Sequence, residues 1–157
     1  MKTSVRKGFG FGLTSGIITT LGMMVGLNSS THSIMIVISG ILIIAIADSF
    51  SDALGIHISE ECETKRTQKE IWESTITTFA SKLFFALTFI VPVLLFELQT
   101  AIIVSIIWGL SLIALLSYYI ARISKVKSYK IILEHVLIAI VVITATHYIG
   151  TFISSMF

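Results

Sequence analysis

The strongest constraint on this chain is a series of apolar runs, each long enough to cross a bilayer. A transmembrane helix needs about 20 predominantly apolar residues, and the 157-residue chain has five such runs. Charged residues make up 13% of the chain, against about 25% in a soluble domain. The runs cover residues 8–27, 33–58, 75–96, 101–123 and 131–153. We therefore predict an all-α, polytopic membrane protein with five transmembrane helices. It would form a single transmembrane domain over residues 1–157, with an acidic cytoplasmic loop at 59–74.

The basic residues predict the orientation of these helices. All 11 Lys and Arg side chains lie in one of three places: before the first run, between the second run and the early part of the third, or between the end of the fourth run and the fifth. Because basic residues concentrate on the cytoplasmic side, we expect the N-terminus inside and the C-terminus outside. Lys82, early in the third run, is expected to snorkel back toward the interface. We predict that the chain is an integral protein of a prokaryotic plasma membrane.

Two aspartates interrupt the second run, in the segment IAIADSFSDALGIHISEE at residues 44–61. Asp48 and Asp52 are four residues apart, so on a helix they share one face, about 6 Å apart along the axis. Ser51 lies on or near that face. An aspartate at the centre of a membrane helix costs about 2.5–3.5 kcal/mol, and such carboxylates usually mark ion pathways. The pattern therefore predicts a proton-coupled cation pathway. The alternative is a structural pair, bonded to hydroxyls or matched to Lys82.

The first run combines small residues with hydroxyl and thioether side chains. Glycines recur every fourth residue in two series, of three and of two, a spacing that lets helices approach closely. They are Gly8, Gly12, Gly16, Gly22 and Gly26. The partner helix belongs either to a second subunit or to the same chain. Ser15 and Thr19 are candidates for the pathway. Met23 and Met24 would add soft ligands to a transition-metal site, or serve only as packing.

An acidic segment follows the second run. His57, Glu60 and Glu61 would gather cations at the cytoplasmic mouth and are candidate metal ligands. The alternative is a solvated helix face with pairs four residues apart, such as Glu61–Lys65 and Arg66–Glu70.

Two motifs resemble the first two helices of the vacuolar iron transporter family. They are GLTSGIITTLGMMVGL at residues 12–27 and ADSFSDALGIHISEE at residues 47–61. Pro92 late in the third run and THYIG at residues 146–150 extend the resemblance over essentially the whole chain. It implies a homodimer that moves Fe²⁺, and often Mn²⁺, out of the cytosol in exchange for protons. The pathway would lie at the two-fold axis, between the first two helices.

The chain departs from that family pattern at its best-known positions. Ser15 stands where the family has the aspartate of its NDG motif. Asp52 falls at the position of the family's second-helix methionine, and Ile56 at its glutamate. The cytosolic helical metal-binding domain of some members is replaced by a short acidic loop. The carboxylate has thus moved from the first helix to the second. A site of hard oxygen ligands without the methionine is expected to favour Mn²⁺ or Mg²⁺ more than the family's usual site does.

Three functions follow from these patterns. We expect a divalent-metal transporter with no permanently bound cofactor, whose partners are lipid, divalent cations, protons and a second copy of itself. An enzyme is disfavoured, because both aspartates share one helix and the GxGD motif of membrane aspartyl proteases is missing. A non-transporting assembly partner or metal sensor is the alternative. No nucleic-acid partner is expected, since the basic residues follow membrane topology and form no binding stripe.

Overall fold

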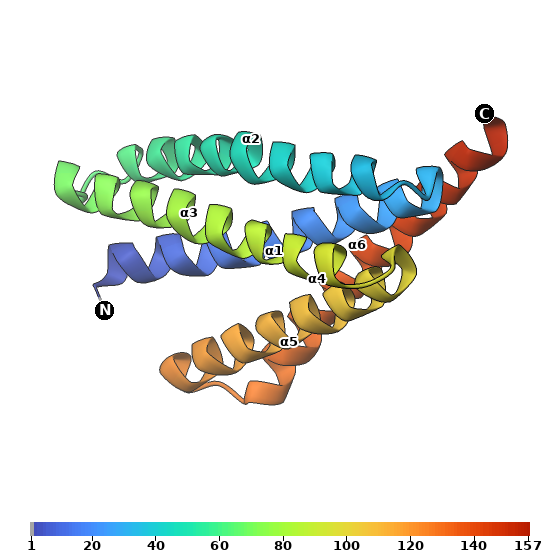
Figure 1. The fold of residues 1–157 in the computed structure, drawn as a ribbon. Coiled ribbons are helices and arrows are strands. Elements are labelled where there is room, and N and C mark those ends of the chain that lie inside the picture. Colours follow the sequence, from blue (N-terminus) through green and yellow to red (C-terminus); the bar gives the residue numbers. More distant parts are fainter. Residues whose placement is uncertain (1) are drawn as a thin grey trace. The chain divides into compact units, whose positions relative to one another are not determined.

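The computed structural model describes residues 2–157, apart from the side chain of Ser124, and over that range it contains helices and no strand. The helices are α1 (Thr3–Thr31), α2 (Ile34–Glu61), α3 (Gln68–Thr88), α4 (Ile90–Leu95), α5 (Leu98–Ser124) and α6 (Ser128–Met156) (Figure 1). Within the described residues, five helical stretches are long and apolar enough to cross a membrane: Thr3–Thr31, Ile34–Glu61, Gln68–Leu95, Leu98–Ile123 and Ser128–Met156. Helices satisfy their own backbone hydrogen bonds, as a bilayer requires. The all-α prediction and its five candidate spans are confirmed.

The third span begins earlier than its hydropathy predicts. Thr67 caps α3, accepting a hydrogen bond from the Glu70 N–H at 3.3 Å, while Glu70 Oε2 accepts one from the Thr67 N–H at 3.0 Å. This reciprocal capping box satisfies two amide groups at the helix start. The connection between α2 and α3 is therefore only residues 62–67, shorter than the predicted loop at 59–74. Hydropathy detected the apolar part of the helix and not its polar first turns.

The same span is interrupted at Phe89, between α3 and α4. Pro92 follows three residues later, and proline cannot donate the helical hydrogen bond to the residue four positions before it. The Phe89 N–H instead bonds the Ala86 carbonyl at 3.2 Å, a tighter turn than an α-helix makes. The helix is thus distorted just before the proline, as expected for a proline within a membrane helix.

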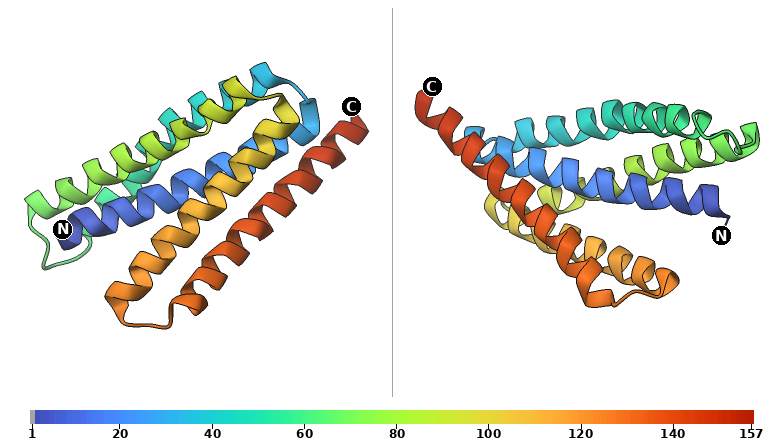
Figure 2. Two further views of the ribbon diagram at one scale, coloured as in Figure 1. Left: turned by 60° about the horizontal axis from the view of Figure 1, so that its bottom comes forward. Right: turned by 180° about the vertical axis from the view of Figure 1, so that it is seen from behind.

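The chain groups into two compact units. The first unit comprises the chain up to Thr20 together with Ile41–Phe89, and the second comprises Leu21–Gly40 together with Ile90–Phe157. In the first unit, parts of α1 and α2 pack with α3. In the second, α5 and α6 lie side by side as a helical hairpin (Figure 2). That hairpin turns at Lys125, which takes the left-handed conformation with φ of 55°.

Five glycines of α1 pack within the chain. In the first unit, a Cβ at Gly8 or Gly12 would collide with the α3 backbone at Ser74 and Thr78, and one at Gly16 would lie 3.0 Å from the Lys82 carbonyl oxygen. In the second unit, Gly22 and Gly26 face Thr146 of α6. Small residues at this spacing allow close helix contact. The partner of this glycine series is therefore α3 in one unit and α6 in the other.

This packing makes Gly12 a sensitive position. We expect Gly12→Ala to destabilise the protein by about 1–3 kcal/mol, because the added methyl must displace the α3 backbone. Gly10→Ala is the matched control, since a Cβ at that position would meet no described atom within 4 Å apart from its chain neighbours and its own helix backbone. Thermal unfolding in detergent measures both variants. Equal melting temperatures for the two would contradict the close α1–α3 contact.

Candidate metal-binding site

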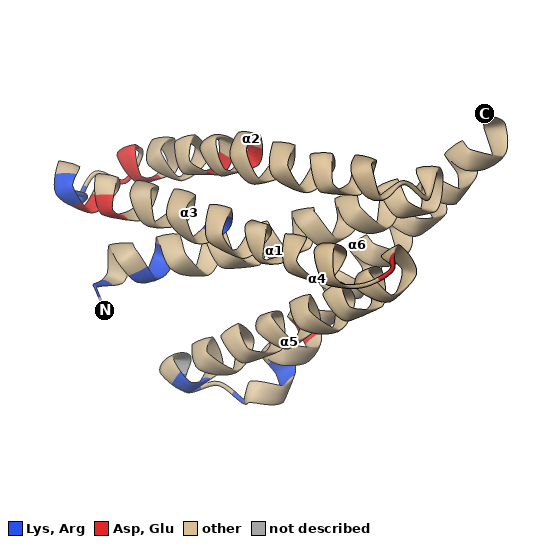
Figure 3. Cartoon of the chain, in the orientation of Figure 1, with Lys and Arg blue, Asp and Glu red and all other residues tan. Residues whose placement is uncertain are grey.

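Four polar side chains from three helices meet inside the first unit. Lys82 of α3 lies at the centre, with its Nζ 2.5 Å from Asp48 Oδ2 and in a second ion pair with Asp52 Oδ2. The same ammonium donates a hydrogen bond to Ser15 Oγ of α1 at 2.9 Å. Figure 3 shows this smaller group of charges partway along α2 and α3, away from the charged helix ends. We call Ser15, Asp48, Asp52 and Lys82 the carboxylate cluster.

Local sequence explains how the cluster forms. The spacing of four residues puts Asp48 and Asp52 on one face of α2, as predicted. Gly16 lets α1 approach the Lys82 backbone closely, which brings the neighbouring Ser15 within reach of the ammonium. Thr19 supports this turn of α1 by donating a hydrogen bond to the Ser15 carbonyl at 2.9 Å. Ser51, the other predicted pathway residue, is exposed and makes no hydrogen bond to a member of the cluster.

The cluster is asymmetric in burial and charge. The Lys82 side chain is 1% exposed, whereas those of Asp48 and Asp52 are 27% and 19% exposed. The expected snorkelling of Lys82 is therefore wrong, because its carboxylate partners hold the ammonium inside the helix bundle. Two carboxylates facing one ammonium leave one net negative charge. The two carboxylates thus already hold the Lys82 ammonium, and the remaining negative charge attracts a further cation.

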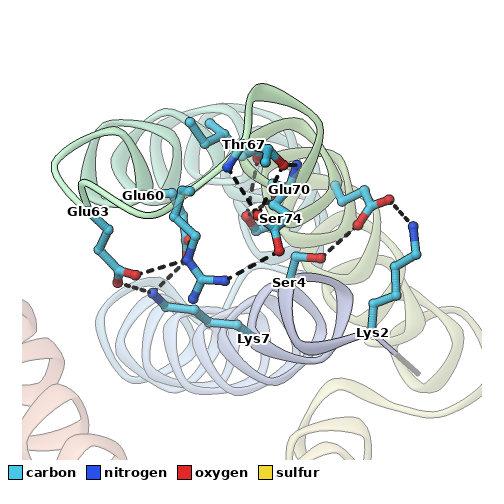
Figure 4. A network of polar contacts seen from close by, with 11 residues as sticks. Lys2, Ser4, Lys7, Glu60, Glu63, Thr67, Glu70 and Ser74 are labelled. Atoms are coloured by element: carbon cyan, nitrogen blue, oxygen red, sulfur yellow. Dashed lines mark hydrogen bonds and ion pairs between the residues drawn. The ribbon is translucent and has the colours of Figure 1, made fainter.

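The remaining acidic candidates lie outside the carboxylate cluster, at the end of the first unit (Figure 4). Glu60 is fully buried and pairs with Lys7 at 2.5 Å and Arg66 at 2.9 Å. Glu63 contacts the same two cations, at 3.0 and 2.9 Å. Arg66 also pairs with Glu70 at 4.0 Å, as the spacing predicts. These contacts favour the interpretation of this segment as an ion-paired helix end that joins α1, α2 and α3.

Ion pairing sets the titration of this helix end. Hydrogen bonds from Lys7 and then Arg66 hold the pKa of Glu63 below its usual range. The stabilising contribution of Glu63 is therefore present above the pKa of the unfolded chain. It is lost as the pH falls through the lowered folded-state pKa.

His57 and Glu61 form a separate small group. His57 Nδ1 contacts Thr75 Oγ1 at 2.9 Å, and its Nε2 lies 3.4 Å from Glu61 Oε1. The imidazole also packs edge-on against the Trp72 ring, with centroids 4.9 Å apart. Glu61 itself is exposed. These contacts tie α2 to α3 near their connection.

Met23 and Met24 belong to the second unit. Met24 is fully buried. The Met23 sulfur packs against Gly40, where an added Cβ would lie only 2.5 Å from it. Both contacts favour the packing interpretation of these methionines. Within the described residues, no three or more His, Cys, Asp or Glu side chains gather in an arrangement that would hold a metal ion.

The network at the helix end gives a direct stability test. We expect Glu60→Gln to destabilise the protein by about 1–3 kcal/mol, because it weakens charge-assisted bonds to Lys7 and Arg66 at a buried position. Glu61→Gln is the control, since that neighbour is exposed and faces His57. Thermal unfolding at neutral pH compares them. Equal stability of the two variants would show that the buried pairs contribute little.

Comparison with known proteins places the chain in a family. The model of the VIT family matches residues 52–151, which include Asp52, Lys82 and all of α5. Neither the curated proteins nor the solved structures contain a match. The matched segment covers more than half of the 157 residues. It includes all of the third and fourth spans and most of the fifth, and the chain therefore belongs to the VIT family.

Proposed function

We propose that this protein transports divalent transition-metal cations, Fe²⁺ or Mn²⁺, out of the cytosol in exchange for protons. Membership in the VIT family suggests metal ion transport across membranes, and the five apolar helices suggest an integral membrane protein. The observation that carries the proposal is the convergence of Asp48 and Asp52 on one cation within apolar helices. Carboxylate and hydroxyl oxygens are suitable ligands for such ions.

In this proposal the metal ion takes the place of the Lys82 ammonium. Ser15, Asp48 and Asp52 already surround a positive charge, so a dication would find oxygen ligands in position. A dication and an ammonium repel each other at this distance, so Lys82 must move away when the metal binds. Protons arriving from outside would then neutralise the aspartates and release the ion. The resemblance to vacuolar iron transporters further supports a homodimer with its pathway at the two-fold axis.

One observation favours a second function, that of a non-transporting assembly partner or sensor. Lys82 is almost fully buried and pairs with both aspartates. A permanent counter-charge of this kind would make the carboxylate cluster a structural link between α1, α2 and α3. The same contacts then hold the helices together without any ion passing.

Flux measurements separate the two functions. Purified protein in proteoliposomes is given an imposed pH gradient and Fe²⁺, Mn²⁺, Co²⁺, Zn²⁺ or Mg²⁺ in turn. We expect metal flux that depends on the gradient, with Fe²⁺ or Mn²⁺ carried best. Folded protein that moves none of these ions would reject transport and leave the structural role.

A further inference from the structure

A cavity with a mainly apolar lining and several polar groups lies within the second unit, between the last turns of α1 and the helices α5 and α6. Its volume is about 580 Å³. Apolar side chains form part of its wall, but imidazole, amide and hydroxyl groups from α1 and α6 also line it. Those that matter here are Asn28, Ser29, His32 and His147. None of the proposed transport ligands of α2 contributes to this wall.

Asn28 brings an unsatisfied acceptor to the cavity. The residue is 7% exposed, and its Oδ1 has no hydrogen-bond partner among the described residues. A buried acceptor without a partner costs about 1–3 kcal/mol. A hydrogen-bond donor or a cation bound in the cavity would satisfy this acceptor and remove that cost.

His147 is held as metal-binding histidines are. Its Nδ1 lies 2.7 Å from Ser29 Oγ, so Nε2 is the nitrogen left for another ligand. When Ser29 accepts the Nδ1 proton, Nε2 carries the lone pair that a metal needs. Second partners of this kind fix the ring and its tautomer in metal sites.

His32 comes to the same cavity through an unusual backbone conformation. It follows the last residue of α1 with φ of 49°, in the left-handed region. Its N–H bonds the Asn28 carbonyl at 3.1 Å, which closes the helix end and ties the two residues together. Non-glycine residues are uncommon there, and when present they often serve a site.

From this juxtaposition we propose that the cavity binds a divalent transition-metal cation through His32, His147 and the Asn28 amide oxygen. Imidazole nitrogen selects ions such as Zn²⁺, Ni²⁺ and Fe²⁺. None of the described residues lining the cavity carries a carboxylate, so Mg²⁺ and Ca²⁺ lack the ligands that they prefer. The proposal is independent of transport through the carboxylate cluster.

Titration with Co²⁺ tests this site in the full-length protein in detergent. Its visible absorption changes when imidazole nitrogen enters the coordination shell, so it reports the ligands as well as the affinity. We expect His147→Ala and His32→Ala each to weaken Co²⁺ binding by at least about tenfold. Ser29→Ala is expected to weaken it by about tenfold, the usual effect of losing a partner of a metal ligand.

The chain offers a matched control. His135 also has its Nδ1 2.8 Å from a serine, Ser117, in the same unit, but neither residue lines the cavity. His135→Ala should bind Co²⁺ as the wild type does. Asp52→Asn should also keep the imidazole absorption, which separates this site from the proposed transport site. His147→Gln, close in size to histidine, replaces His147→Ala if the alanine variant does not fold.

The proposal fails if removing either cavity histidine leaves Co²⁺ binding and its spectrum unchanged. It also fails if Mg²⁺ displaces Co²⁺ at equal concentration, because a site of imidazoles without carboxylates would not allow that. Loss of the signal in Asp52→Asn alone would assign the binding to the carboxylate cluster instead.

Discussion

Asp52→Asn is expected to abolish gradient-driven metal flux while leaving the protein folded. The amide keeps the shape of the side chain but removes one of the two negative charges that face the cation. Lys82 keeps Asp48 as its partner at 2.5 Å, so the ammonium is not left unpaired. The cluster then has no net charge, and a dication meets one carboxylate and an ammonium. Losing one partner of a close charge pair costs about 3 kcal/mol, which is about a hundredfold in affinity.

The measurement is initial Mn²⁺ uptake into proteoliposomes under a fixed pH gradient. Ser51→Ala is the control, because Ser51 is the neighbouring residue on α2 and is exposed. We expect it to transport normally. Asp48→Asn should behave like Asp52→Asn, since both carboxylates contact the same ammonium. Normal uptake by both asparagine variants would reject the carboxylate cluster as the transport site.

The helices of this protein were predictable because the bilayer leaves few alternatives for long apolar segments. The number of spans and the shared face of Asp48 and Asp52 follow from the length of the apolar runs and from helical periodicity. The start of α3 was missed because its first turns are polar and are stabilised by the Thr67 cap. A capping box can be recognised in a sequence, and Thr67 and Glu70 have the right spacing.

The direction of Lys82 was not predictable in the same way. A lysine near a helix end snorkels unless a partner holds it inside, and that partner depends on which helices touch. Gly16 lets α1 approach α3 at Lys82, but glycine spacing does not reveal which helix fills the gap. The cavity of the second unit was not predictable for the same reason, because its wall depends on which helices touch. His32 and His147 are far apart in the chain and line the same cavity only because of how the helices pack.

Lys82→Met distinguishes a replaceable ammonium from a permanent one. Without metal, we expect the variant to lose about 3–5 kcal/mol of stability, because two partly buried carboxylates lose their shared partner and face each other. If the cluster accepts a dication, Mn²⁺ should now bind it more tightly than in the wild type. Binding to the folded state alone raises stability by about 2.7 kcal/mol at a hundred times the dissociation constant. Thermal unfolding with and without Mn²⁺ should therefore show a large metal-dependent recovery that the wild type lacks.

A second variant makes this result specific to the carboxylate cluster. Combining Lys82→Met with Asp48→Asn and Asp52→Asn removes all three charges, so no like charges remain to repel each other. Replacing a buried ion group by neutral residues of similar size is often tolerated. This triple variant should be more stable than Lys82→Met without metal and should gain nothing from Mn²⁺ at the cluster. If Mn²⁺ does not restore the stability of Lys82→Met, the aspartates hold helices together and do not bind the transported ion. Their carboxylates would then be free of the ammonium and still not bind Mn²⁺.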